Sequence, residues 1–283
     1  MEPETLTELM DSEAMQDVAD IVEDAERLAR RLELLDRLRN NQEILSHSAF
    51  NEFMKSPRHF IAYKLRQKKT TPAMAFGSMC HCLVLEPSEF ENRYIVSPKF
   101  DRRTKVGKEA FAEFASTAGD KLIVSESDYQ NANYLRDCLY KNESSAFVLE
   151  RIKQTEVPIE WKYKGLQWHG YIDGQGNGIK CDLKFMQDAS PKKIERAIRF
   201  DGYGNQAVHY QRGSNKPDDD YYLVACDRSG NVTVCELTKG FLHICSQEID
   251  TYIAHFKRCQ YLDMWHRSFD FFAPNGIYQI TSW

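Results

Sequence analysis

Residues 166–184 read LQWHGYIDGQGNGIKCDLK, and this stretch decides the fold. Before the glycines, apolar and polar residues alternate with the period of a β-strand that has one buried face. The segment 174–178 is typical of a turn, and the alternation then resumes, so that Asp182 and Lys184 share one face of the next strand. The stretch therefore predicts a β-hairpin that carries a lysine and two carboxylates, Asp173 and Asp182.

Together, the side chains of Asp173, Asp182 and Lys184 are typical of phosphodiester hydrolysis. Carboxylate oxygens are ligands that Mg²⁺ and Mn²⁺ prefer, and an ammonium group beside them can orient an attacking water. We expect Asp182 and Lys184 to project from strand ends into a solvated cleft. A hairpin symmetric about Gly176 would place Asp182 opposite Gly170, roughly 10 Å from Asp173, so either the turn is irregular or the strands pair differently. An ordinary exposed hairpin also explains the three residues.

The segments around the hairpin show patterns of both strands and helices. Strands are predicted at 157–163, 221–226 and 232–237, and helices at 48–85 with breaks, 190–200, after 203, and 246–268. In the helix after 203, Gln206 and Tyr210 are four residues apart and lie on one face. Helices that flank a sheet predict the α/β class.

The first 43 residues differ in charge from the rest of the chain. They hold thirteen acidic side chains and five arginines and thus a net charge of −8, which leaves +3 for residues 44–283. Apolar residues recur every three or four positions, at Val18, Ile21, Ala25, Leu28, Leu32 and Leu35. We predict an acidic amphipathic helical arm over 1–43, whose apolar seam docks on the chain's own body or on a neighbouring subunit, and one domain over 44–283.

Two basic clusters stand out in a chain whose net charge is −5. Local clusters can neutralise phosphates even when the whole protein is acidic. The candidate DNA contacts are Lys68, Lys69, Arg102, Arg103, Lys105 and Lys108. A merely soluble surface explains these charges equally well.

The eight cysteines include no Cys-x-x-Cys pair and fall mostly in apolar runs. This spacing argues against a disulfide framework or a zinc ribbon, and we expect buried free thiols. No apolar run approaches the roughly 20 residues of a membrane span, and the first residues lack the pattern of a secretory signal. We therefore expect a cytoplasmic protein without a membrane partner.

Residues 77–87, GSMCHCLVLEP, resemble the segment Gly-x-x-x-His-x-x-x-Leu-Glu-Pro of the exonuclease VIII (RecE) type of phage and prophage nucleases. That type belongs to the RecB-like branch of the PD-(D/E)xK nuclease superfamily. The residues from Arg102 to Lys108 resemble its next block, and Gln206 with Tyr210 resembles its helix after the active-site hairpin. The resemblance covers about 45–270 and leaves the acidic arm outside it.

This resemblance implies a PD-(D/E)xK nuclease core, in which helices flank a mixed central sheet. It assigns Asp173, Asp182 and Lys184 to the motif and adds Gln206 and Tyr210 to the catalytic set. The metal ligands that it implies are His81, Asp173, Asp182 and the carbonyl of Leu183. Ile172 stands where the motif has proline, and Asp182 is an aspartate where many relatives have glutamate.

Several of these residues also have simpler explanations. His81 lies in an apolar helical pattern and can be a hydrogen-bonded core histidine, while Gln206 and Tyr210 can hold a helix against the sheet. Glu160 and His169 are weaker candidates on exposed strand faces. The cysteines beside His81 pack in the core in our interpretation, because thiolates are poor Mg²⁺ ligands.

The function that the resemblance implies is a DNA exonuclease that depends on Mg²⁺ or Mn²⁺. It implies digestion of double-stranded DNA from 5′ to 3′, which leaves a 3′ single strand for a phage annealing protein, and a ring-shaped homo-oligomer in the bacterial host cytoplasm. Another PD-(D/E)xK nuclease, either an endonuclease or an enzyme specific for single strands, is an alternative. The cysteine spacing disfavours the iron–sulfur branch. A catalytically silent DNA- or protein-binding module is the alternative from a different class.

Overall fold

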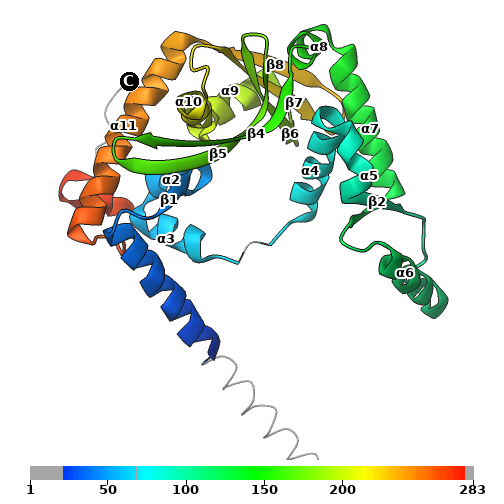
Figure 1. Ribbon diagram of the computed structural model, residues 1–283, viewed down its shortest axis with the longest axis horizontal. Coiled ribbons are helices and arrows are strands. Elements are labelled where there is room, and N and C mark those ends of the chain that lie inside the picture. The colour runs from blue at the N-terminus through cyan, green and yellow to red at the C-terminus, as the bar shows by residue number, and fades with distance from the viewer. Residues whose placement is uncertain (1–21, 68, 278–283) are drawn as a thin grey trace, which may run out of the picture. The chain divides into compact units, whose positions relative to one another are not determined.

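The computed structural model describes residues 22–67 and 69–277 (Figure 1). These residues form two compact units. Unit 1 consists of 22–67, 162–168 and 250–277, and unit 2 consists of 69–161 and 169–249. The chain thus enters unit 1 three times.

A mixed sheet runs in the order β1-β5-β6-β7-β8, and β4 pairs with β5. The strands are β1 (Ile44–Ser46), β4 (Gln154–Tyr163), β5 (Leu166–Gly176), β6 (Ile179–Met186), β7 (Asp220–Asp227) and β8 (Val232–Leu237). β6 is antiparallel to β5 and parallel to β7, and β8 is antiparallel to β7. The mixed sheet with helices confirms the predicted α/β class.

The β5–β6 hairpin has a tight two-residue turn at Asn177 and Gly178 (φ 49° and 83°). Two successive positive φ angles match the twist of paired strands and suit asparagine followed by glycine. Gly174 lies opposite Cys181. One residue further from the turn, β5 carries Asp173 and β6 carries Asp182, so the two carboxylates are neighbours. Of the two alternatives, the second is correct: the strands pair differently from a hairpin symmetric about Gly176, because the turn is centred between Asn177 and Gly178.

Helices cover both faces of the sheet in unit 2. α4 (Pro72–Leu85), α7 (Glu126–Lys141) and α8 (Glu143–Leu149) share one buried cluster with β6 and β7. Leu183 of β6 belongs to this cluster, whereas its neighbour Asp182 contacts Gln206 of the opposite helix layer. Since successive strand residues point to opposite faces, the two helix layers lie on opposite sides of β6.

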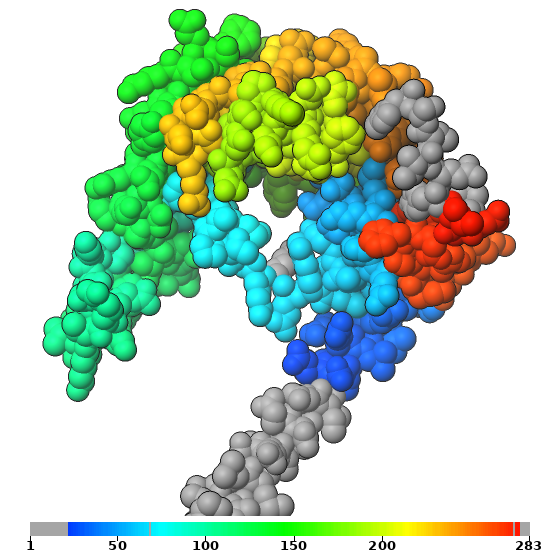
Figure 2. Space-filling model, turned by 180° about the vertical axis from the view of Figure 1, so that it is seen from behind, coloured from blue at the N-terminus to red at the C-terminus, as the bar shows by residue number. Residues whose placement is uncertain are grey.

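The second layer contains α9 (Pro191–Phe200) and α10 (Tyr203–Gly213), which pack against each other (Figure 2, yellow-green). Gly170 of β5 allows close approach, because a Cβ there would lie 2.9 Å from a ring carbon of Tyr210. A larger residue at 170 would push α10 away from the strand.

α11 (Lys239–Leu262) begins seven residues earlier than predicted and ends six residues earlier. Thr238 caps the first turn. Its hydroxyl oxygen accepts a hydrogen bond from the backbone N–H of Phe241, and its carbonyl accepts one from the N–H of Leu242. Asp263 adopts a left-handed φ of 50°, which ends the helix. Neither α11 nor any other helix of the described residues is both long and apolar enough to cross a membrane.

A smaller substructure of unit 2 follows α4. It contains η1 (Pro87–Glu89), α5 (Phe90–Arg93), β2 (Tyr94–Ser97), α6 (Lys105–Thr117) and β3 (Leu122–Ser125). β2 and β3 pair in parallel, apart from the main sheet.

Unit 1 is built around an aromatic cluster. Its elements are β1, α2 (His47–Lys55), α3 (Pro57–Leu65), the second part of α11, η2 (Phe269–Phe272) and η3 (Pro274–Gly276). Phe53 is completely buried at the centre. Its ring contacts those of Phe50, Phe60, Phe256, Trp265, Phe271 and Phe272.

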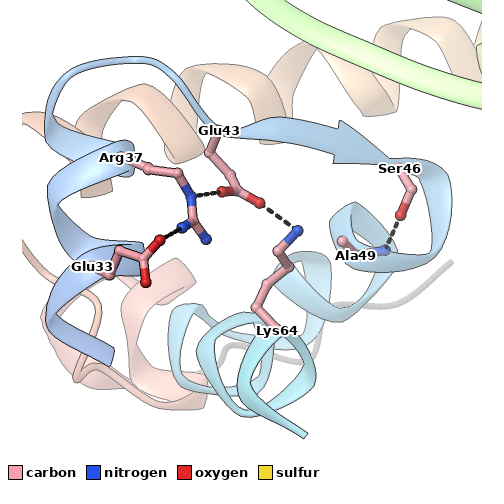
Figure 3. A network of polar contacts seen from close by, with 6 residues as sticks. All are labelled: Glu33, Arg37, Glu43, Ser46, Ala49 and Lys64. Atoms are coloured by element: carbon pink, nitrogen blue, oxygen red, sulfur yellow. Dashed lines mark hydrogen bonds and ion pairs between the residues drawn. The ribbon is translucent and has the colours of Figure 1, made fainter. Parts of the chain in front are cut away.

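Residues 22–39 are helical, as predicted for the arm. Over its described part the apolar seam does not dock on the chain's own body at Leu28 and Leu32, which are 57% and 56% exposed, whereas Leu34 and Leu38 are buried. Docking of the seam on a neighbouring subunit stays a prediction. Val18 and Ile21 lie outside the described residues. Besides the buried Leu34 and Leu38, polar contacts hold the helix end, and Figure 3 shows them.

The buried side chain of Glu43 is the centre of these polar contacts. It accepts a hydrogen bond from Nε of Arg37 at 2.9 Å and pairs with Lys64 of α3 (Figure 3). Arg37 also pairs with Glu33 at 2.8 Å. The carboxylate therefore ties the end of the arm helix to α3 within unit 1.

All eight cysteines are free, as expected from their spacing. Six of them are buried, and Cys138 and Cys235 are half-buried.

Candidate active site

The predicted motif residues come together in unit 2. Oδ2 of Asp173 accepts a hydrogen bond from the backbone N–H of Leu183 at 2.8 Å. Oδ2 of Asp182 lies 2.6 Å from Nζ of Lys184. Asp182 is only 2% exposed, so the expectation that it projects into a solvated cleft was wrong. β6 is a central strand, and the helix layer that carries Gln206 covers Asp182.

Burial controls the charges of this group. It raises the pKa of Asp182 to about 6, although the nearby Lys184 opposes the shift. Burial also raises the pKa of Asp173, against the effects of Lys184, the N–H of Leu183 and a hydrogen bond with Asp182. For Lys184, burial alone would lower the pKa, but Asp182 and Asp173 together raise it above its ordinary value. Lys184 therefore stays charged at neutral pH.

His81 of α4 faces this group. Its Nδ1 lies 3.8 Å from Oδ2 of Asp173. Burial, with help from the charge of Lys184, lowers the pKa of His81 to about 4. The imidazole is thus neutral at physiological pH, which is the form that binds metal ions. It lines a cavity of about 680 Å³ and is not sealed in the core.

Glu156 of β4 is the site residue that the sequence did not reveal. His81, Glu156 and Asp173 each offer one ligand atom, and these atoms lie within 4.8 Å of one another. Burial and the charge of Asp173 raise the pKa of Glu156 to about 7. Its φ of 47° is left-handed, which interrupts the regular alternation of β4. The sequence suggested Glu160 instead, which is exposed.

This donor set fits a hard divalent cation. One imidazole nitrogen and two carboxylates converge on the cavity, and such ligands suit Mg²⁺ or Mn²⁺. Cys82 lines the same cavity, but burial raises the pKa of its thiol and so disfavours the thiolate. Packing in the core therefore remains the better interpretation of this cysteine.

Gln206 and Tyr210 of α10 support Asp182. Nε2 of Gln206 donates to Oδ1 of Asp182 at 3.2 Å and to the hydroxyl oxygen of Tyr210 at 3.0 Å. Burial raises the pKa of Tyr210 to about 12, so its hydroxyl stays protonated. Neither residue lines the cavity of His81. Their contacts are those of positioning residues, and their predicted catalytic role stays a prediction.

The predicted DNA contacts lie elsewhere in the chain. Arg102, Arg103, Lys105 and Lys108 are exposed at the start of α6, and none lines the site cavity. Arg103 pairs with Asp101 at 2.9 Å, and the guanidinium of Arg102 lies 4.2 Å from the ring centre of Phe111. Lys69 is exposed, and Lys68 lies outside the described residues. Their role in DNA binding stays a prediction.

Comparison with known proteins supports the fold. A crystal structure of a "putative exonuclease" from Eubacterium rectale superposes with a TM-score of 0.56 and 16% sequence identity, and the match covers 79% of this chain and 83% of that one. A search of curated proteins gave no match. Residues 46–268 match the family described as "PDDEXK-like domain of unknown function (DUF3799)". Because this match spans most of the chain, the protein belongs to that PDDEXK-like family.

Proposed function

We propose that this protein is a metal-dependent nuclease that hydrolyses phosphodiester bonds in DNA as an exonuclease. The observation that carries the proposal is the convergence of His81, Glu156 and Asp173 next to a charged lysine, Lys184, in one cavity. Membership of a PDDEXK-like family supports it. The description of the Eubacterium rectale protein as a "putative exonuclease" agrees with it.

His81, Glu156 and Asp173 would hold the cation, which we propose is Mg²⁺ or Mn²⁺. When bound, a divalent cation polarises the phosphoryl oxygen and offsets negative charge that builds up during hydrolysis. Asp182 has its oxygens engaged by Lys184 and Gln206, and it lies beside Asp173 on the neighbouring strand. Its role as a direct ligand, like that of the carbonyl of Leu183, remains part of the proposal.

Lys184 holds the attacking water or a phosphate oxygen by hydrogen bonding. Its Nζ is placed by Asp182 and lies 5.2 Å from the ring centre of Tyr203. Because its pKa is raised, the ammonium orients the water but does not act as the base. Asp182, with a pKa of about 6, is the carboxylate next to Lys184 that can accept the proton.

The finer substrate assignment is supported by the sequence resemblance alone, that is, by residues 77–87, 102–108, Gln206 and Tyr210. On that basis we propose digestion of duplex DNA from 5′ to 3′, a ring-shaped oligomer, and transfer of the 3′ single strand to a phage annealing protein. We propose the cytoplasm of a bacterial host as the place of action.

A cleavage assay tests this function. A linear duplex labelled at one 5′ end, a duplex labelled at one 3′ end and a closed circular plasmid are incubated with Mg²⁺, Mn²⁺ or EDTA. We expect metal-dependent release of labelled mononucleotides first from the 5′-labelled duplex, and no cleavage of the circle. Cleavage of the circle would indicate an endonuclease, and a folded protein that cleaves no DNA with either metal would be a silent binding module.

Metal affinity should fall as the pH is lowered from 8 to 6. A cation must displace the proton of Glu156, whose pKa is about 7, so the affinity should drop about tenfold over this range. His81, with a pKa of about 4, is already neutral and adds nothing to the change. Calorimetric titration with Mn²⁺ at the two pH values measures it. Equal affinities at pH 6 and pH 8 would show that Glu156 is not a ligand.

Glu156→Gly should weaken Mn²⁺ binding but stabilise the fold relative to Glu156→Ala. Both changes remove the carboxylate, yet only glycine relieves the left-handed backbone at φ 47°. We expect a difference of about 1 kcal/mol in the free energy of unfolding, measured by urea denaturation. If the alanine variant is as stable as the glycine variant, this backbone conformation is not strained.

A further inference from the structure

A second cavity, of about 380 Å³, adjoins the cavity of the candidate metal ligands in unit 2. The two cavities have lining residues in common, among them Gly77 of α4 and Phe185 of β6. The ring centre of Phe185 lies 5.7 Å from that of His81. A molecule bound at the candidate metal ligands could therefore extend past Phe185 into this second cavity.

The lining of the second cavity combines apolar walls with one positive charge. Its walls include the rings of Phe76 and Phe185 and the aliphatic side chains of Leu135 and Met186. Arg228 is the one charged residue among the described residues that line it. Aromatic rings accept the flat face of a nucleobase, and a guanidinium pairs with phosphate. A base and a phosphate are two of the three chemical parts of a nucleotide, the third being the sugar.

The turn that carries Arg228 is held firmly between β7 and β8. Oδ1 of the buried Asp227 accepts the backbone N–H groups of Ser229 and Asn231 at 2.9 and 3.1 Å. The hydroxyl of Tyr134 donates to the carbonyl of Ser229 at 3.1 Å. The backbone on both sides of Arg228 therefore has fixed partners.

The guanidinium of Arg228 is available to a ligand. Its carbon lies 5.5 Å from the ring centre of Phe76, and the side chain is exposed. The ion pairs found among the described residues include none of Arg228 with a carboxylate. A phosphate could thus bind it without displacing an internal partner.

We propose that this cavity, the Arg228 subsite, holds the nucleotide next to the phosphate that is cleaved. The base lies against Phe76 and Phe185, and the neighbouring phosphate pairs with Arg228. The volume of 380 Å³ is near the lower end of ligand pockets, about 300–1,000 Å³, so it suits one unpaired nucleotide and not a base pair. The inference rests on the proposed nuclease function and adds that the strand is unpaired where it enters.

Two substrates separate this subsite from the metal site. Methyl 4-nitrophenyl phosphate has neither a base nor a second phosphate, whereas an eight-nucleotide oligothymidylate has both. For Arg228→Ala we expect a KM for the oligonucleotide about tenfold higher, with hydrolysis of the small ester unchanged. Arg228→Lys should restore part of the loss. Arg136→Ala serves as the matched control, because Arg136 pairs with Asp137 and lines neither cavity.

Salt dependence gives a readout that a purely structural role would not change. Binding of the fluorescent oligonucleotide is measured in EDTA by anisotropy at several salt concentrations. Loss of one phosphate contact should lower the slope of log affinity against log salt by about 0.7 in Arg228→Ala. An unchanged slope together with an unchanged KM, or equal losses on both substrates, would overturn the proposal.

The two proposals can fail separately. If the wild type hydrolyses neither substrate, the nuclease function fails, yet the binding experiment in EDTA still tests Arg228. If the wild type hydrolyses both substrates and Arg228→Ala matches it in KM and salt slope, only the subsite is wrong.

Discussion

Replacing Asp182 by asparagine should lower the rate of DNA hydrolysis by at least about a thousandfold. Asparagine has nearly the same shape and can still accept the hydrogen bond from Gln206. It lacks the charge that holds Nζ of Lys184 at 2.6 Å, and it cannot accept a proton as the carboxylate can. Positioning of the nucleophile and proton transfer should therefore be lost together.

The control for this variant is Asp188→Asn, the same chemical change at an exposed position of unit 2. It should keep the wild-type rate. Circular dichroism of both variants reports the fold, and cleavage of an end-labelled duplex with Mg²⁺ reports activity. Metal-dependent cleavage by folded Asp182→Asn at a rate near that of the wild type would remove Asp182 from the chemistry.

Replacing Phe53 by alanine should destabilise unit 1 by about 3–5 kcal/mol. The ring is completely buried and contacts six other aromatic rings, so its loss removes apolar burial and leaves a cavity. Urea denaturation followed by circular dichroism measures the loss.

Phe269→Ala is the matched control in the same unit, because Phe269 is 57% exposed. It should change the free energy of unfolding by less than about 0.5 kcal/mol. Similar losses in the two variants would show that the aromatic cluster does not stabilise unit 1 as its packing suggests. Because the candidate ligands lie in unit 2, Mn²⁺ titration shows whether a Phe53→Ala effect stays within unit 1.

Alternating hydrophobicity was sufficient to find most of the main sheet. β7 and β8 begin and end within a residue or so of the predicted strands, because apolar runs and turn residues mark both limits. The start of α11 was missed, since Gly240 in its first turn is a weak helix former and its beginning is set by the side chain of Thr238. Short elements such as β2 and β3 have only four residues each and give no clear period.

The sequence identified those residues of the candidate site that belong to a recognisable motif. Asp173, Asp182, Lys184 and His81 were named from the sequence, and the structure brings them together. The burial of Asp182 was not foreseen. The alternation of apolar and polar residues along a strand does not distinguish a polar face that is exposed from one that a second helix layer covers. Glu156 was missed because its position depends on one left-handed residue, which leaves no periodic signal.

Unit 1 is built from three separate segments of the chain, and this affects how the protein folds during synthesis. A ribosome releases the chain from its N-terminus, so Phe50, Phe53 and Phe60 emerge long before their partners in residues 250–277. All segments of unit 2 are complete at residue 249, and unit 2 can therefore fold while unit 1 still lacks its last segment. During that interval the aromatic side chains of α2 and α3 are exposed to other nascent chains. Exposed apolar side chains make a nascent chain prone to aggregation, and this exposure ends only when residues 250–277 have left the ribosome.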